Sequence, residues 1–89
     1  MTIREAIFLY REYKKVDVKE FCVEVFISED RIRKIEESEN NTIDIDDLLK
    51  LYQFFSTTIG IKDPRELQIK SVISHLLVEE IRKKSNGSP

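Results

Sequence analysis

Segment 28–41 carries the densest group of side chains in the chain that could bond to another molecule. Its three bases could donate hydrogen bonds to guanine or to phosphate, and its acids could accept from the amino group of cytosine. The segment begins Ser28-Glu29-Asp30, so two acids come directly after a residue that favours the start of a helix. The bases are Arg31, Arg33 and Lys34.

The charge balance permits a second interpretation of this segment. It holds five acids against three bases, and residues 1–45 hold eleven acids against eight bases. The whole chain has 15 Lys and Arg, 17 Asp and Glu, and a formal net charge of −2. Neutralisation of phosphates supplies most non-specific affinity for nucleic acid, and this chain has little excess positive charge to offer. Glu29 and Asp30 could equally serve only as favourable charges at a helix N-terminus.

Catalytic and metal chemistry find little support in the residue types. The single cysteine, Cys22, excludes an internal disulfide, and with one histidine, His75, it excludes a Cys/His structural zinc site. We interpret Cys22 as a buried thiol and His75 as a solvated side chain. No phosphate-binding loop or nucleophile motif is present, so we expect no enzyme, no metal and no cofactor.

The elements that must position these residues are predicted to be helices. Eighty-nine residues suffice for one small domain, and apolar residues recur every three or four positions with few glycines or prolines. The spacing predicts helices over 2–15, 17–25, 29–37, 44–55 and 64–84, with Thr2, Asp17, Ser28, Asp44 and Asp63 as N-caps. We expect the inward residues to be Ile3, Ala6, Ile7, Tyr10, Phe21, Cys22, Val25, Ile32, Ile35, Ile45, Leu48, Leu49, Leu51, Tyr52 and Phe55.

The order of residue types in 16–36 (VDVKEFCVEVFISEDRIRKIE) resembles the phage-repressor and Cro-like, xenobiotic-response-element type helix-turn-helix family. The resemblance extends over about residues 3–59. Its matches are Phe21-Cys22 at the family's Leu-Ala, Ile27-Ser28 at its Val-Ser, Ile32 with Ile35-Glu36 at the end of its reading helix, Tyr10-Arg11 upstream, and Leu48-Leu49-Lys50-Leu51 downstream.

The resemblance implies an all-α, lambda-repressor-like helix-turn-helix domain in which segment 29–37 enters the major groove. It also implies a semi-buried ion pair between Arg11 and Glu36, for which the alternative is two unrelated surface charges. Two positions depart from the family: Val18 replaces a phosphate-positioning glutamine, and Phe26 replaces the turn glycine. Because phenylalanine enters the left-handed conformation only at a cost, we expect the turn to differ from the family's.

The candidate DNA contacts lie on the reading segment and on either side of it. Lysines near the start of the second helix and asparagines after the third would contact phosphates. The predicted DNA-binding residues are Lys15, Lys19, Ser28, Glu29, Asp30, Arg31, Arg33, Lys34 and Asn41, with Lys14 and Asn40 as further phosphate contacts.

The C-terminal helix carries a continuous apolar stripe. One interpretation is that it packs back on the rest of the domain, and the other is that it forms a homodimer interface. The predicted dimerisation residues are Ile69, Val72, Ile73, Leu76, Leu77 and Ile81. We divide the chain into a head over 1–59, a linker and long helix over 60–84, and a disordered tail over 85–89.

These patterns lead to one function and one alternative. The chain is expected to be a small bacterial or phage transcriptional regulator, repressor-like, cytoplasmic, binding double-stranded DNA as a homodimer. The alternative is a protein-interaction module on the same scaffold, an antirepressor or regulator-binding factor that binds another regulatory protein and not DNA. No apolar run approaches 18 residues and the N-terminus lacks a signal-peptide layout, so no membrane partner is expected.

Overall fold

The computed structural model describes residues 1–37 and 43–86, and in these residues the chain forms five α-helices and no β-strand. The prediction of an all-α fold is therefore confirmed. No helix among the described residues combines the length and apolar character needed to cross a membrane. The helices are α1 (Ile3–Lys14), α2 (Val18–Val25), α3 (Glu29–Glu37), α4 (Ile45–Ser56) and α5 (Pro64–Asn86).

Side-chain caps fix the beginnings of the first two helices. The Thr2 hydroxyl accepts from the Glu5 backbone N–H at 3.1 Å, and the Glu5 carboxylate accepts from the Thr2 backbone N–H at 3.1 Å. The Asp17 carboxylate accepts from the Glu20 backbone N–H at 2.8 Å. Asp44 precedes α4 but makes no such bond, because its carboxylate is bound to another side chain. The spacing of capping residues therefore predicted where these helices begin, and not what each carboxylate binds.

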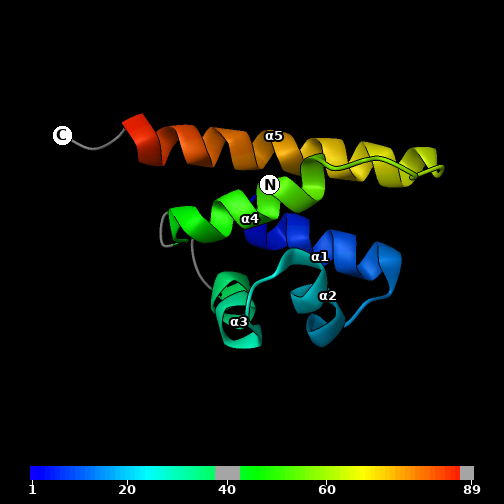
Figure 1. Cartoon of the computed structure of the whole chain (residues 1–89), viewed down its shortest axis with the longest axis horizontal. Helices are drawn as coiled ribbons and strands as arrows, with labels where there is room; N and C mark the ends of the chain where they lie inside the picture. The colour runs from blue at the N-terminus through cyan, green and yellow to red at the C-terminus, as the bar shows by residue number, and fades with distance from the viewer. Residues whose placement is uncertain (38–42, 87–89) are drawn as a thin grey trace.

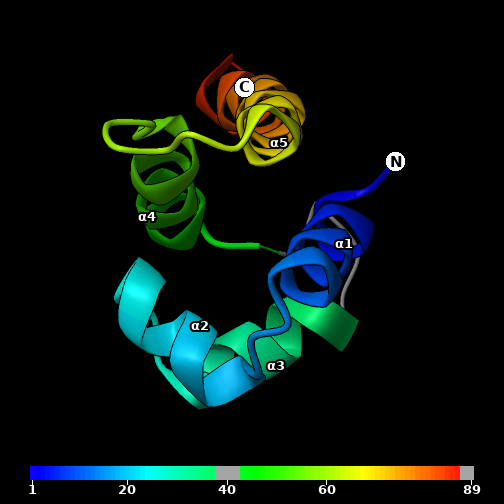
Figure 2. The same cartoon turned by 90° about the vertical axis from the view of Figure 1, so that its right-hand side faces the viewer.

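The helices surround one core (Figures 1 and 2). Figure 2 shows α1 and α4 on two sides of the core, with α5 above them and α2 and α3 below. The long helix α5 packs mainly on α4 and also on α1. As a result, α3 lies at the end of the molecule away from α5, where one of its sides faces outward.

The core draws on all five helices and on the connecting residues Ile27 and Ile43. At its centre the rings of Tyr10, Phe21, Phe54 and Phe55 pack with centroids 5.0–6.2 Å apart. Such edge-to-face contacts add to the burial of apolar area. The buried apolar residues are Ile3, Ala6, Ile7, Tyr10, Phe21, Val25, Ile27, Ile32, Ile35, Ile43, Leu48, Leu51, Phe55, Ile73 and Leu77.

Two predicted core residues of α4 are exposed. Leu48, Leu51 and Phe55 form the buried stripe, whereas Ile45 and Leu49 keep 37 % and 48 % of their surface accessible. The expectation that Ile45 and Leu49 face inward is wrong, because the covered side of α4 is narrower than its run of apolar residues.

The C-terminal helix is part of the same core. Ile73 and Leu77 are buried against α1 and α4, so α5 shares its core with residues 1–59. The helix continues to Asn86, two residues beyond the predicted end at Lys84. Ser85 and Asn86, which we expected in a disordered tail, are therefore helical, and 87–89 lie outside the described residues.

The turn between α2 and α3 contains a strained residue. Phe26 has φ 60° and ψ 38°, the left-handed conformation, and its N–H donates to the Cys22 carbonyl. Phe26 thus adopts the left-handed conformation despite its cost, while the expected difference from the family's turn stays a prediction. The next N–H, that of the buried Ile27, donates to the same carbonyl at 3.3 Å, and these two bonds with the burial of Ile27 hold Phe26 in place. The conformation costs a residue with a Cβ about 1–2 kcal/mol.

A lysine is buried where α5 crosses the end of α4. The ammonium of Lys70 donates to the Thr57 carbonyl at 2.9 Å and lies 4.3 Å from the centroid of the Phe54 ring. Burial lowers the pKa of Lys70 below its usual value. The spacing of apolar residues did not predict this interaction, because Lys70 lies beside the apolar stripe of α5.

Candidate nucleic-acid interface

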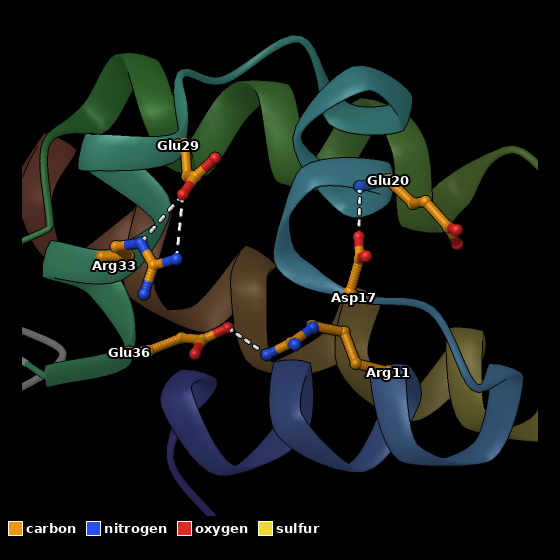
Figure 3. Close-up of polar contacts among 6 residues, drawn as sticks. All are labelled: Arg11, Asp17, Glu20, Glu29, Arg33 and Glu36. Carbon is orange, nitrogen blue, oxygen red and sulfur yellow. Dashed lines mark hydrogen bonds and ion pairs between the residues drawn. The ribbon is translucent and has the colours of Figure 1, made fainter.

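The inner side of α3 is anchored to the rest of the domain. Ile32 and Ile35 are buried in the core. Glu36, at the end of the same helix, accepts from Arg11 of α1, with Nη1 and Oε1 2.6 Å apart (Figure 3). The expected pair of Arg11 and Glu36 is thus present in the structure.

This pair is largely shielded from water. The side chains of Arg11 and Glu36 are 17 % and 21 % exposed. Among the described residues, Arg11 Nε is buried without a hydrogen-bond partner, so the guanidinium binds Glu36 through one nitrogen only. A single charge-assisted bond in such surroundings fixes direction more than it adds stability, because desolvation offsets much of the attraction.

A second arginine–glutamate pair lies on the same flank of α3 as Glu36 and is more exposed. Arg33 donates to Glu29 one turn earlier, with Nε and Nη2 3.1 and 2.8 Å from the same carboxylate oxygen (Figure 3). The hydrogen bonds from Arg33 to Glu29 raise the pKa of Arg33 above its usual value. The Arg33 side chain is 57 % exposed, so water and other ligands reach it.

Arg31 is bound to the start of α4. Its Nε lies 3.0 Å from Asp47 Oδ2, and its Nη2 lies 2.9 Å from Asp44 Oδ2. Asp47 is buried, and the guanidinium of Arg31 supplies its counter-charge. We infer that Arg31 holds α3 against α4 in addition to any contact with DNA. The sequence did not reveal Asp44 and Asp47 as partners of Arg31. Acidic residues at the start of a helix are already accounted for by their favourable interaction with the helix dipole.

The remaining candidate residues of α3 are exposed. Ser28 accepts weakly from the Arg31 backbone N–H at 3.4 Å, and Asp30 faces solvent. Within residues 1–37 and 43–86, Lys34 forms no ion pair and no side-chain hydrogen bond. Lys34 is therefore the α3 cation that is most available to an external anion.

The candidate phosphate contacts around α2 divide into two groups. Lys15 and Lys19 are exposed, the first directly after α1 and the second in the first turn of α2. Lys14 is bound to Glu66 of α5, with Nζ and Oε1 2.9 Å apart. The predicted contacts Asn40 and Asn41 lie outside the described residues.

The apolar stripe of α5 is mostly covered by this chain. Ile73 and Leu77 are fully buried and cannot belong to an exposed dimer interface, which corrects their assignment. Ile69, Leu76 and Ile81 are partly buried and pack against the core. Val72 is the predicted dimerisation residue with the largest exposure, at 46 %. The sequence could not distinguish the buried residues of this stripe from the exposed ones. An apolar stripe shows which side of a helix is apolar, and not how much of that side the other helices cover.

No metal-binding cluster is found in the described part of the chain. In 1–37 and 43–86, no three His, Cys, Asp or Glu side chains lie close enough to hold a metal ion. Cys22 is partly buried, and burial raises the pKa of its thiol, so that less of the reactive thiolate form is present.

In comparisons with protein-family models, curated proteins and solved structures, none matches this chain. Its function must therefore be argued from its own residues and geometry.

Proposed function

We propose that the chain is a lambda-repressor-like helix-turn-helix protein that binds duplex DNA as a homodimer. It regulates transcription in the bacterial cytoplasm, as a protein either of the bacterium or of a phage. In this proposal α2 and α3 form the helix-turn-helix, and α3 enters the major groove.

The observation that carries the proposal is the two-sided construction of α3. Ile32, Ile35 and the pair of Glu36 with Arg11 hold its inner side against the domain. Arg33 and Lys34 lie outside its buried stripe, and their charged groups are accessible. A reading helix needs both properties, because side chains can select bases only when the helix that carries them has a fixed orientation.

The acids of α3 limit how the protein can bind. Glu29 and Arg33 neutralise each other, so this pair adds little to non-specific attraction. On a matching site, Arg33 would exchange one or both bonds for guanine, and Glu29 would accept from a cytosine amino group. Specific base contacts and two linked reading heads then supply affinity that the net charge of −2 does not.

The test is selection of binding sites from a random duplex library at low salt, followed by affinity measurements on the selected site. We expect enrichment of a two-fold symmetric sequence, with half-sites about one helical turn apart. The double variant Arg33→Ala/Lys34→Ala should bind that site at least about tenfold more weakly, because it removes one base contact and one phosphate contact.

The matched control is Arg82→Ala. Arg82 is an exposed cation on α5, the helix that lies on the opposite side of the molecule from α3 (Figure 1). Its loss should change affinity less than about twofold, as expected for a distant charge under salt screening. Failure of the wild-type chain to enrich any sequence at low salt would contradict the proposal.

A second candidate function is the protein-interaction module, and one observation favours it. Val23 and Phe26, at the end of α2 and in the turn before α3, are 75 % and 82 % exposed. Apolar side chains this accessible suit contact with a protein partner. Binding through them would persist at high salt and be lost in Phe26→Asp, whereas the DNA complex would weaken steeply as salt rises.

A further inference from the structure

The outer surface of α1 is apolar at its centre and charged at its ends. We name this face, made of Met1, Arg4, Glu5, Phe8, Leu9 and Glu12, the α1 outer surface. Its apolar members are large and uncovered: Met1 is 66 %, Phe8 56 % and Leu9 44 % exposed. With Glu36 of α3, the six residues surround an open hollow of about 540 Å³. The apolar spacing of α1 did not predict this face, because Phe8 and Leu9 lie beside the buried stripe.

Two of the three charged residues of this face, Arg4 and Glu12, are arranged symmetrically about Phe8, whereas Glu5 caps the start of α1. Arg4 lies four residues before Phe8 and Glu12 four residues after it, which places both on the same side of the helix. Both are exposed, and within residues 1–37 and 43–86 neither forms an ion pair or a side-chain hydrogen bond. The two ends of the face therefore carry opposite charges, of which Arg4 also acts electrostatically on the neighbouring Glu5.

A second copy of this chain would provide ion-pair partners for Arg4 and Glu12. When two α1 helices pack antiparallel about a two-fold axis at Phe8, Arg4 of each faces Glu12 of the other, and the two phenylalanines meet at the axis. The same packing seats each Phe8 in or beside the hollow of the other copy. A heterologous partner would need a matching pattern of its own, whereas this surface complements itself.

The position of α1 in the fold makes this symmetry compatible with DNA binding. In Figure 2, α1 runs toward the viewer, with α5 above it and α3 below it. A two-fold axis beside α1, directed from the α5 side to the α3 side, keeps both α3 helices at the same end of the dimer. Both would therefore face a single DNA duplex.

We propose that the α1 outer surface is a homodimer interface, with Phe8 at its two-fold axis and Arg4–Glu12 ion pairs between the two copies. This interface rests on the proposed function only because that function expects a homodimer. It lies on α1, whereas the apolar stripe had predicted an interface on α5.

The first test is sedimentation equilibrium of the full chain without DNA. We expect a reversible dimer whose dissociation constant rises at least about tenfold in Phe8→Asp, because a carboxylate would be buried at the axis. The matched controls are Val72→Asp on α5 and Ile59→Asp in the loop before α5, where apolar side chains are 46 % and 94 % exposed. Neither control should change dimerisation, and circular dichroism should show unchanged helix content in all three variants.

The second test uses charge reversal, which leaves the apolar contact intact. Arg4→Glu and Glu12→Arg should each weaken the dimer, because each places like charges opposite one another. The double variant should restore the wild-type dissociation constant. Recovery of dimerisation in the double variant identifies Arg4 and Glu12 as partners across the two-fold axis. If these residues only stabilised the fold of each copy, the double variant would not recover.

Several results would overturn the inference. These are a chain that stays monomeric at every concentration, a dimer that Val72→Asp dissociates and Phe8→Asp does not, or a double variant without recovery. Failure of the proposed function is separate: a chain that dimerises through α1 but enriches no DNA sequence contradicts DNA binding alone. A chain that binds DNA as a monomer contradicts the dimer alone.

Discussion

Helix α3 makes two arginine–glutamate pairs, an inner and an outer one, that differ in exposure. The inner pair joins Glu36 to Arg11 of α1, and their side chains are 21 % and 17 % exposed. The outer pair joins Glu29 to Arg33 within the helix, and their side chains are 35 % and 57 % exposed. The inner pair has little competition from water and holds the helix in position, whereas the outer pair is screened and can exchange partners. Burial, and not residue type, separates a structural ion pair from one available for binding.

The largest effect is expected on the apolar part of the inner side. Ile32→Ala should lower the free energy of unfolding by about 2–4 kcal/mol, because Ile32 is fully buried and its removal leaves a cavity. Urea denaturation followed by circular dichroism measures this loss. Lys34→Ala, on the outer side of the same helix, should change stability by less than about 0.5 kcal/mol. Equal losses in the two variants would mean that α3 has no distinct inner side.

A smaller loss is expected when the inner ion pair is broken. Arg11→Ala should cost about 1–2 kcal/mol, between the values for exposed and buried pairs, because Glu36 keeps a partly buried charge without a partner. For a domain of this size that corresponds to a fall in Tm of roughly 4–15 °C. Arg33→Ala should lower Tm far less, since its partner remains in water. An unchanged Tm in Arg11→Ala would show that the inner pair does not hold α3.

The outer pair should affect binding more than stability. Glu29→Gln frees Arg33 and removes a negative charge from the face that the proposed function directs at DNA, so non-specific affinity at low salt should rise by about three- to tenfold. Stability should change by less than about 0.5 kcal/mol, the usual size of an exposed pair one helical turn apart. Fluorescence anisotropy with a labelled random duplex measures the affinity. A lower affinity for this duplex would mean that Glu29 itself contacts the DNA.

The smallest effect is expected in the turn that leads into α3. Phe26→Gly should raise the free energy of unfolding by about 0.5 kcal/mol, because relief of the left-handed strain slightly exceeds the added freedom of glycine in the unfolded chain. Phe26 is 82 % exposed, so little buried area is lost. Lys15→Gly is the matched variant at the end of α1, where Lys15 has φ 56°. Destabilisation in Phe26→Gly alone would show that the ring of Phe26 makes a contact that stabilises the turn.

The helices and most of the core followed from the sequence because both depend on local spacing. Ile3, Ile7 and Tyr10 repeat at helical intervals, and Pro64 after Asp63 predicted the start of α5. These features need no knowledge of how the helices cross, so their prediction was reliable.

The candidate site was less predictable because its contacts join separate helices. The bonds of Arg31 to Asp44 and Asp47 depend on the angle between α3 and α4, which residue spacing does not encode. The exposure of Phe8 likewise depends on which side of α1 the other helices leave uncovered. A rule for single residues also failed at Phe26, where the burial of its neighbour Ile27 and two backbone bonds outweigh the local preference.

The protonation of Lys70 is coupled to the packing of α5 on α4. Burial lowers the pKa of Lys70 in the folded chain, whereas in the unfolded chain the pKa returns to its ordinary value. Below the lowered pKa both states carry the proton, and folding bears the full cost of burying the charge. As pH rises through the lowered pKa toward the ordinary one, the folded chain loses the proton first and this cost declines. In that alkaline window, the packing of α5 over the end of α4 is accompanied by release of a proton to the solvent.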